Sequence, residues 1–264
     1  MTVATTEWII DQDWRRYTAA EHARWTALFD IQKALLPDRA CDAFMNGLDA
    51  LDLGHGGIPD FDRLNEGLRF LTGWQIIAVP GLVPDAVFFD MLARRRFPAG
   101  RFIRNSRQLD YLQEPDIFHD VFGHVPMLTD PVFADYMQAY GEGGLRALHR
   151  EQLHHLARLY WHTVEFGLLQ TPTGLRIYGA GIVSSKTETL FALENPTPRR
   201  LGFALERVMR TPYKIDDLQP TYFVAPSLDA LLQATLQDFG PLYDRLARAS
   251  DIPSGKTVAS DVVF

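Results

Sequence analysis

The spacing of apolar residues along the chain predicts a mainly helical fold. Between residues 19 and 36 apolar positions recur every three or four residues, as they do on one face of an α-helix. Pro37 ends that segment, because proline removes a backbone donor and clashes with the preceding turn. Similar patterns predict further helices at 39–51, 60–71, 84–95, 131–140, 145–169, 185–193, 198–209 and 227–239, with a last turn or two reaching about 247. Segment 145–169 is the longest uninterrupted candidate.

Short β-branched or aromatic runs bounded by glycine, proline or charge predict a few strands. They lie at 74–79, 101–104, 175–178 and 222–224. Residues 1–18 have no clear periodicity, so we expect an N-terminal arm that lies on the body of the protein. No break in composition marks a boundary. We therefore expect residues 1–264 to form a single domain that is mainly α, or α+β with a few short strands.

Composition limits the class of protein. A chain of 264 residues with 47% hydrophobic content is long enough for one large core. The formal charge of −7 argues against a nucleic-acid partner, whose binders carry a basic face. Cys41 is the only cysteine, so no intrachain disulfide is possible, which is typical of a reducing compartment. No secretory signal pattern is evident, and no apolar run approaches the ~20 residues that a membrane span needs. We expect a cytoplasmic protein with no membrane contact.

Two histidines and one glutamate are the candidate chemistry. His119 and His124 stand in a strongly apolar segment, and Glu165 follows among bulky apolar residues. Two imidazoles and a carboxylate are the ligand set that leaves coordination positions open on Fe(II) for chemistry with oxygen. Burying an unpaired carboxylate is unfavourable by several kcal/mol, and a divalent cation would remove that penalty. A salt bridge from Glu165 to Arg158 or His162 would also remove it, and the spacing leaves that alternative open.

Local signals predict where the two histidines lie. Pro115 suits a first helical turn, Gly123 suits the position just past a helix end, and Pro126 blocks continuation. We therefore predict a short helix over 115–122. Five residues of α-helix turn through roughly 140° in net terms, so the two imidazoles would not share one face. We expect His124 beyond the helix end, swung back toward His119 by a kink at Gly123.

Other metal or nucleotide sites lack their patterns. The chain has no HExxH, no multi-thiolate zinc set, no GxGxxG and no GxxxxGK[ST]. His55 stands in a glycine-rich turn, and we expect a solvated loop residue there. Charged neighbours predict a solvated helix face without metal for the remaining candidates, which are His149, His154, His155 and His162.

Three segments resemble the pterin-dependent aromatic amino acid hydroxylases. They are PDIFHDVFGHVP at 115–126, YWHTVEFG at 160–167 and YGAGIVSS at 178–185. The resemblance covers roughly residues 70–226, including QPTYFVA at 219–225, and is nearest to bacterial members that hydroxylate phenylalanine. Three motifs in order are far more specific than one. The resemblance implies a catalytic domain without the regulatory domain of the animal enzymes. No heptad run for tetramer assembly is visible, so we expect a monomer.

The resemblance also implies the reaction and the ligands. His119, His124 and Glu165 would hold Fe(II). O₂ and a tetrahydropterin, either tetrahydrobiopterin or a related bacterial pterin, would convert L-phenylalanine to L-tyrosine. Tryptophan or tyrosine as substrate stays open, as does a non-catalytic metal- or pterin-binding protein. A 2-oxoglutarate oxygenase is disfavoured, because those enzymes usually present His-x-Asp before a distant histidine.

Further roles carry over position by position. Arg104 matches the arginine that grips the substrate carboxylate, where a guanidinium binds both oxygens. The substrate's polar end would lie near Gly181 and Ser184, and its ring between Pro115 and Trp161. The pterin cleft would be formed by Leu82, Val83, Asp85, Phe88, Asp120, Ala157 and Tyr160, with the Phe88 ring stacked on the pterin and Asp120 bonded to it through water. Two positions depart from the animal members, since Leu112 replaces a threonine that helps hold substrate and His162 replaces a phenylalanine.

Overall fold

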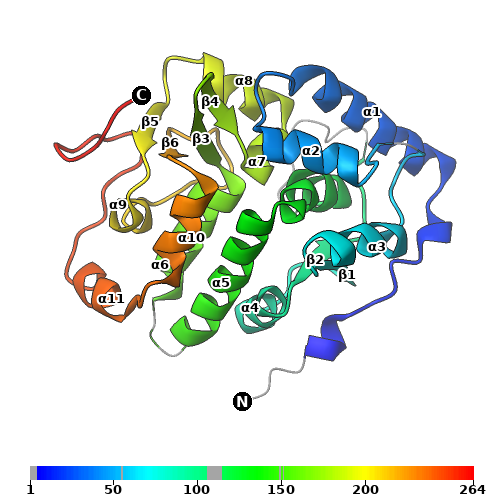
Figure 1. The fold of residues 1–264 in the computed structure, drawn as a ribbon, viewed down its shortest axis with the longest axis horizontal. Helices are drawn as coiled ribbons and strands as arrows, with labels where there is room; N and C mark the ends of the chain where they lie inside the picture. The colour runs from blue at the N-terminus through cyan, green and yellow to red at the C-terminus, as the bar shows by residue number, and fades with distance from the viewer. Residues whose placement is uncertain (1–4, 55, 106–114, 149, 151) are drawn as a thin grey trace.

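Two small β-sheets lie among a larger number of helices in the computed structural model (Figure 1). It describes residues 5–54, 56–105, 115–148, 150 and 152–264. The predicted class, mainly helical with a few short strands, is confirmed. The expectations for His55, Leu112 and His149 fall outside the described residues. In the part of the chain that is described, no helix has the length and apolarity to cross a membrane.

The first three helices form where local signals predict them. Helix α1 (Ala19–Leu35) begins with a reciprocal capping box between Thr18 and Glu21. Helix α2 (Asp42–Ala50) starts three residues later than predicted. Helix α3 (Phe61–Leu71) is capped by Asp60, and Gly73 follows it at a φ of 77°, in the left-handed region that favours glycine.

The first sheet is a parallel pair joined by a helix. Strand β1 (Gln75–Val79) pairs with β2 (Arg96–Gly100), and α4 (Asp85–Ala93) makes the crossover. The Asn65 side chain closes the free edge of β1, since it accepts from Ile76 N at 2.6 Å and donates to Ile76 O at 3.0 Å. Ile10 N donates to Ala78 O at 3.0 Å, so the N-terminal segment runs along the same edge. That segment contains the 3₁₀ helices η1 (Thr5–Trp8) and η2 (Trp14–Arg16).

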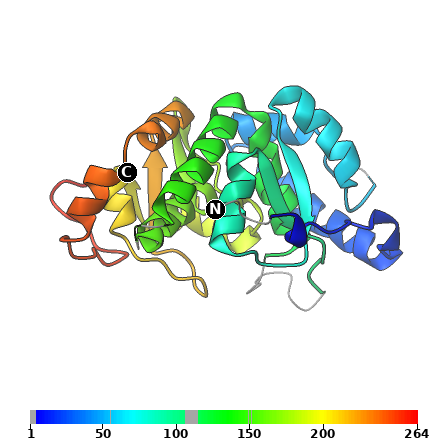
Figure 2. The same cartoon turned by 90° about the horizontal axis from the view of Figure 1, so that it is seen from below.

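The second sheet has the strand order β4-β3-β6-β5. Its strands are β3 (Gly167–Thr171), β4 (Gly174–Ile177), β5 (Arg199–Gly202) and β6 (Thr221–Ala225). β3 and β4 are antiparallel, and the other two pairs are parallel. Near the C-terminus, Val263 forms an antiparallel bridge with Leu201 of β5. Helix α5 (Pro131–Ala147) lies between the two sheets in both views (Figures 1 and 2).

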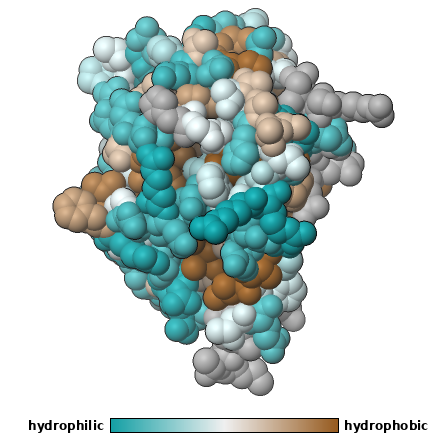
Figure 3. Space-filling view, turned by 90° about the vertical axis from the view of Figure 1, so that its right-hand side faces the viewer, coloured by the Kyte–Doolittle hydropathy of each residue, from teal (hydrophilic) through white to brown (hydrophobic). Residues whose placement is uncertain are grey.

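The remaining helices follow in chain order. They are η3 (Phe118–His124), η4 (Val125–Thr129), α6 (Leu153–Tyr160), η5 (Trp161–Glu165), α7 (Ala180–Val183), α8 (Lys186–Glu194), α9 (Leu205–Met209), α10 (Leu228–Leu236) and α11 (Gly240–Leu246). One connected core cluster runs from Trp25 to Leu246. Within it Phe118 and Phe122 stack with ring centroids 4.7 Å apart. This packing fixes the segment that carries the two histidines. The face on the right of Figure 1 is mostly hydrophilic, with apolar side chains in separate patches (Figure 3).

The predicted long helix over 145–169 is wrong. Helix α5 continues through Gly141 and Gly144 to Ala147, and α6, η5 and β3 follow from Leu153 onward. The two glycines are places of close approach to α4. A Cβ on Gly141 would lie 2.5 Å from Ala93 N, and one on Gly144 would lie 2.1 Å from the Phe89 ring. The glycine-rich stretch therefore belongs inside a helix, because tertiary packing outweighs propensity there.

Two other predictions fail because strands pair with distant partners. The range 198–209 is not one helix, since β5 pairs with β6 and α9 begins only at Leu205. Residues 101–104 form no strand, and β2 lies directly before them. Pro98 within β2 disfavours a strand in the sequence, but among the described residues β2 pairs with β1 alone, which leaves its other edge able to accept a proline.

Candidate metal centre

Both histidines lie within one π-helix. The segment η3 (Phe118–His124) is π-helical and leads directly into η4. A π-helix closes its hydrogen bonds between residues five apart, so His119 and His124 lie one above the other. Their Nε2 atoms are 3.3 Å apart. The prediction that the helix ends at Phe122 with His124 beyond it is therefore wrong, because the wider turn already brings the imidazoles together.

Gly123 allows close packing and makes no kink. A Cβ at this position would lie 3.0 Å from Ala180 O and 3.2 Å from Ala180 Cβ. The φ angle of Gly123 is not positive, so its backbone conformation does not require glycine. The glycine is therefore needed because η3 packs directly against α7, and the position of both histidines depends on that contact.

Glu165 ends a second π-helix, η5, which continues α6. Its Oε1 lies 3.2 Å from His124 Nε2, and its Oε2 lies 3.4 Å from His119 Nε2. One ligand atom from each of the three residues lies within 4.8 Å of the others. The partners of the alternative salt bridge are engaged elsewhere. Arg158 binds Asp251 through two bonds of 2.7 and 2.8 Å, and His162 Nε2 donates to Thr211 O at 3.0 Å. The prediction of a solvated helix face is wrong for His155 and His162, because both side chains are buried.

The electrostatics of the three residues suit a divalent cation. Burial opposes ionisation of Glu165, but the adjacent His124 and His119 hold the pKa of its carboxyl well below the usual range. Burial lowers the pKa of His124 and so favours its neutral, metal-binding form. Burial opposes protonation of His119, but the Glu165 carboxylate raises the pKa of its imidazole, and a bound cation would replace that proton. Two imidazole nitrogens and a carboxylate converge in a buried place, which is the donor set that Fe(II) and similar ions take.

A serine orients one of the imidazoles. The Ser184 hydroxyl donates to Ala180 O at 2.7 Å, so its oxygen accepts from His119 Nδ1 at 3.1 Å. That bond places the proton of the neutral imidazole on Nδ1, which leaves Nε2 able to bind a metal. On the other side Asp116 Oδ1 accepts from His119 N at 3.0 Å.

A cavity of about 380 Å³ opens beside these three residues. Of the predicted substrate and pterin residues, those that line it are Leu82, Val83, Asp85, Phe88, Pro115, Asp120, Tyr160 and Trp161. Phe88 and Tyr160 meet edge to face, with ring centroids 5.5 Å apart. Aromatic and apolar side chains with a few polar groups are typical of a site for a small organic ligand.

Four predicted residues are not among those lining the cavity. Arg104 is buried, and its Nε and Nη2 donate to Asp116 at 2.9 and 2.8 Å. Ser184 binds His119, as described above. A Cβ on Gly181 would lie 2.9 Å from the Phe166 ring, and Ala157 is half-buried in α6.

The sequence profile of the biopterin-dependent aromatic amino acid hydroxylases matches residues 13–250. The chain belongs to this family. It is 66% identical over 261 residues to the phenylalanine-4-hydroxylase of Caulobacter vibrioides, over 99% of this chain and 89% of that one. It is 59% identical over 258 residues to the phenylalanine-4-hydroxylase of Ralstonia nicotianae, over 98% of this chain and 82% of that one.

A solved structure in this hydroxylase family supports the fold. Chromobacterium violaceum phenylalanine hydroxylase with bound iron(III) and the oxidised cofactor 7,8-dihydrobiopterin matches with a TM-score of 0.94 and 50% identity, over 100% of this chain and 99% of that one. The structure of that enzyme bound to cobalt matches with a TM-score of 0.95.

Asp120 is a buried acid that lines the cavity. Burial raises the pKa of its carboxyl to about 7, and its Oδ2 accepts from Gly100 N at 2.7 Å. That contact comes from β2, the strand that sequence reasoning missed.

Six further lining residues were also missed, namely Val79, Gly81, Phe97, Pro98, Gly100 and Tyr213. Tyr213 stacks on Trp161 with ring centroids 4.3 Å apart and planes 12° apart. Phe97 packs on His124, with ring centroids 4.8 Å apart. A tyrosine directly after Pro212 was the only signal for Tyr213, and it is too common to indicate a site. The β2 residues required knowledge of the pairing with β1.

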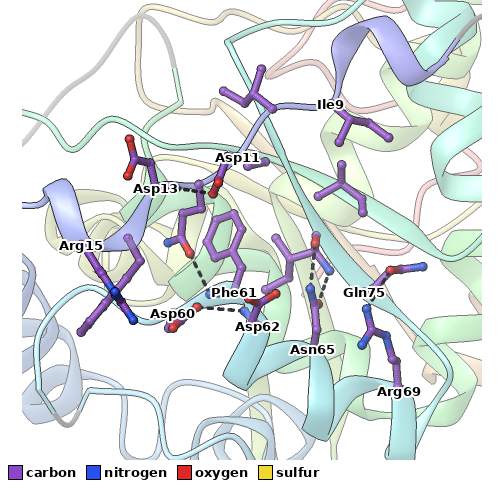
Figure 4. A pocket seen from close by; sticks show the side chains of 16 residues that line it. Ile9, Asp11, Asp13, Arg15, Asp60, Phe61, Asp62, Asn65, Arg69 and Gln75 are labelled. Atoms are coloured by element: carbon purple, nitrogen blue, oxygen red, sulfur yellow. Dashed lines mark hydrogen bonds between the residues drawn. The ribbon is translucent and has the colours of Figure 1, made fainter.

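A larger cavity, of about 530 Å³, lies between the N-terminal segment, α3 and β1, and His119, His124 and Glu165 are not among the residues that line it (Figure 4). Its carboxylates are used locally. Asp11 accepts from Asp13 N at 2.8 Å, and Asp60 accepts from Asp62 N at 3.0 Å. These bonds shape the turn before η2 and the start of α3. The local bonds therefore explain why Asp11 and Asp60 lie here, and no bound ligand is needed to explain them.

Proposed function

We propose that this chain is a phenylalanine 4-monooxygenase that converts L-phenylalanine to L-tyrosine with O₂ and a tetrahydropterin. In this proposal His119, His124 and Glu165 hold Fe(II). The observation that carries it is the convergence of their ligand atoms within 4.8 Å at the wall of an aromatic-lined cavity. The names of the relatives supply the substrate, since the ones described above are phenylalanine hydroxylases.

When bound, the iron supplies open coordination positions for O₂ beside the reduced pterin, which provides two electrons. The residues of the chain position the partners and exclude water. His119 keeps its Nε2 free for the metal because its Nδ1 donates to Ser184. Tyr160 and Phe97 shield His124 from solvent, with ring centroids 6.3 and 4.8 Å from the imidazole. A dry, preorganised site strengthens the electrostatic interactions within it.

Arg104 is the proposed partner of the substrate carboxylate. Its two bonds to Asp116 fix the plane of the guanidinium, and its backbone N–H donates to the same carboxylate at 2.8 Å. A buried guanidinium held in one plane suits bidentate binding of a carboxylate. The substrate ring is proposed to lie between Pro115 and Trp161, with Gly181 and Ser184 toward its polar end.

The pterin is proposed to occupy the opposite part of the cavity. Leu82 and Val83 line the cavity there, and Asp85 lies in the first turn of α4. Phe88 offers a ring to stack on, supported edge-on by Tyr160. Asp120 is proposed to bind the pterin through water, and Ala157 to pack against this part of the site from α6.

The test is tyrosine formation. The protein is reconstituted with Fe(II), supplied with phenylalanine and tetrahydrobiopterin in air, and the product is identified by chromatography. We expect tyrosine from the wild type and none above background from His119→Ala. Competition with tryptophan and tyrosine as substrates tests the two other aromatic hydroxylase activities. Iron-loaded, folded protein that binds pterin without forming tyrosine would instead indicate a non-catalytic binding protein.

We further propose that residues 1–264 act as one catalytic domain and as a monomer in the cytoplasm. The connected core from Trp25 to Leu246 supports the single domain. Light scattering on the purified protein tests the monomer, since a dimer would double the measured mass. Cell fractionation tests the compartment.

A further inference from the structure

We propose that Gln219 is a positioning residue that holds the ring of Trp161 in place and thereby sets which aromatic side chain the cavity accepts. This inference rests on the proposed function, because it names a determinant of substrate preference at the same site. Gln219 does not line the cavity itself. It follows the loop after α9 and acts through the aromatic wall.

The first observation is the bond between the two side chains. Trp161 Nε1 donates to Gln219 Oε1 at 3.0 Å. Gln219 is 1% exposed, so water cannot readily replace a hydrogen bond that its amide loses. Its Nε2 donates to Lys214 O at 2.8 Å and to Asp217 O at 3.1 Å. The donors and the acceptor of the amide are all used, and a rotation of Gln219 would leave buried polar groups unpaired.

The second observation is that one amide fixes both members of an aromatic stack. Tyr213 lies on the same loop whose carbonyls Gln219 binds, and it stacks on Trp161 with planes 12° apart. Phe166 contacts Trp161 as well, at 4.9 Å between ring centroids. Tyr213 and Trp161 both line the cavity. The Gln219 amide therefore holds Trp161 directly and Tyr213 through its loop.

The third observation is that the backbone of Gln219 is held by a buried glutamate. Its backbone N–H donates to Glu188 Oε1 at 3.3 Å, and the same oxygen accepts the Tyr222 hydroxyl. Glu188 is 6% exposed and belongs to α8. The acceptor offered to Trp161 is therefore fixed to two separate elements, α8 and β6, and is not free to follow the indole if the ring turns.

Trp161 and Glu165 are the first and last residues of η5, so the wall and the metal ligand share one short helix. A wall that turns by a small amount changes the width available to the substrate ring. Changes of about one methylene in a hydrophobic pocket alter discrimination by roughly 10- to 200-fold. Releasing Trp161 should therefore weaken the preference for phenylalanine over the larger tryptophan, while the ligands themselves stay in place.

The experiment uses Gln219→Met, which keeps the length of the side chain and removes its donors and acceptor. We expect KM for phenylalanine to rise about tenfold with kcat within about threefold. The preference for phenylalanine over tryptophan in kcat/KM should fall by about tenfold. The matched control is Gln233→Met, which changes an exposed glutamine of α10 and should leave all three values unchanged.

A double-mutant cycle with Trp161→Phe separates positioning from a general structural effect. If Gln219 acts through the indole, Gln219→Met should have little further effect on KM in the Trp161→Phe background. Independent, additive effects in the two backgrounds would overturn the proposal. Gln219→Glu keeps an oxygen acceptor for the indole but loses the donors to Lys214 O and Asp217 O, so its KM for phenylalanine should also rise.

A spectroscopic readout is independent of turnover. In the wild type, the ¹⁵N-indole N–H resonance of Trp161, assigned by its loss in Trp161→Phe, should be protected from exchange with solvent. It should shift and lose protection in Gln219→Met and stay protected in Gln233→Met. An unchanged Trp161 resonance in Gln219→Met would overturn the positioning role even if the wild type formed no tyrosine. Failure of this proposal and failure of the proposed function are thus distinguishable.

Discussion

His119 and His124 bring their Nε2 atoms within 3.3 Å of each other because the chain between them is π-helical. In an α-helix the same five-residue spacing would turn the rings roughly 140° apart. The π-helix is rare and is found mostly at functional sites, so other contacts must hold it. Here the stacked pair Phe118 and Phe122 and the contact of Gly123 with α7 supply them.

Gly123→Ala should therefore weaken both stability and metal binding. The new Cβ would meet Ala180 O at 3.0 Å and Ala180 Cβ at 3.2 Å, and neither is the end of a flexible side chain. We expect a loss of about 1–3 kcal/mol in the free energy of unfolding, as for other overpacked cores. Urea unfolding measures the stability, and iron content after dialysis measures the metal affinity.

Gly143→Ala is the control for that substitution. Gly143 also lies in a helix, but a Cβ there would have only Arg146 Nη2 nearby, at 3.8 Å. Alanine at this position should stabilise the protein by about 0.5–1 kcal/mol, because glycine loses more conformational freedom in a helix. Equal effects of the two substitutions would contradict a special role for the contact with α7.

Segments with strong local signals were predictable from the sequence, and segments that depend on distant partners were not. The Thr18–Glu21 capping box and the Ser227 cap act within one turn, so α1 and α10 lie where expected. Strand β5 exists because Arg199–Gly202 pairs with β6, in the register that places Arg199 opposite Thr221. No residue within 199–202 indicates that partner. The helical spacing of the residues that follow predicts a helix from 198, whereas α9 begins only at Leu205.

The same division holds at the site. The residue types of His119, His124 and Glu165 indicated a metal set, because few other roles need that combination in apolar surroundings. Their geometry was mispredicted, since a π-turn depends on packing against α7. Tyr213 was missed because its place on Trp161 is set by loop contacts through Gln219. The sequence thus indicated which residues carry the chemistry, but it did not indicate the contacts that hold these residues in place.

Glu165→Gln should abolish stable iron binding while the fold persists. The substitution keeps the shape of the side chain and removes the only carboxylate among the three ligands. Metal analysis after dialysis against iron-free buffer should show wild-type protein with about one iron per chain and the variant with almost none. Glu194→Gln, which changes an exposed partner of Arg39, should keep its iron. Full iron occupancy in Glu165→Gln would remove this residue from the ligand set.

The wild type should lose stability as the pH falls into the mildly acidic range, and His162→Phe should lose less. His162 is fully buried, and burial lowers the pKa of its imidazole to about 4 from an ordinary value of 6.5. Between those pH values the unfolded chain binds a proton that the folded protein does not, so stability falls as the pH drops from 6.5 to 4 and then levels off. The contribution is about 3 kcal/mol. Urea unfolding from pH 8 to pH 4 measures it, and parallel curves for variant and wild type would contradict it.

Asp261→Asn should destabilise the protein far more than Asp251→Asn, although both remove a carboxylate that binds an arginine. Asp261 and Arg207 have side chains that are 3% and 6% exposed, and their Oδ1 and Nε atoms are 3.0 Å apart. Removing one partner of a buried pair leaves an uncompensated charge and costs about 3–5 kcal/mol. Asp251, which is 49% exposed, pairs with Arg158 near solvent, where the loss should be at most about 1 kcal/mol.

The consequence of Asp261→Asn should reach the cavity wall. Arg207 also donates to the Thr211 hydroxyl and to Lys256 O, so it connects the C-terminal segment to the loop that carries Tyr213. Urea unfolding compares the two variants, and phenylalanine KM at a temperature where both are folded tests the connection. We expect a raised KM only for Asp261→Asn. Equal losses in the free energy of unfolding of the two variants would contradict this prediction. The buried Arg207–Asp261 pair would then contribute no more than the exposed pair.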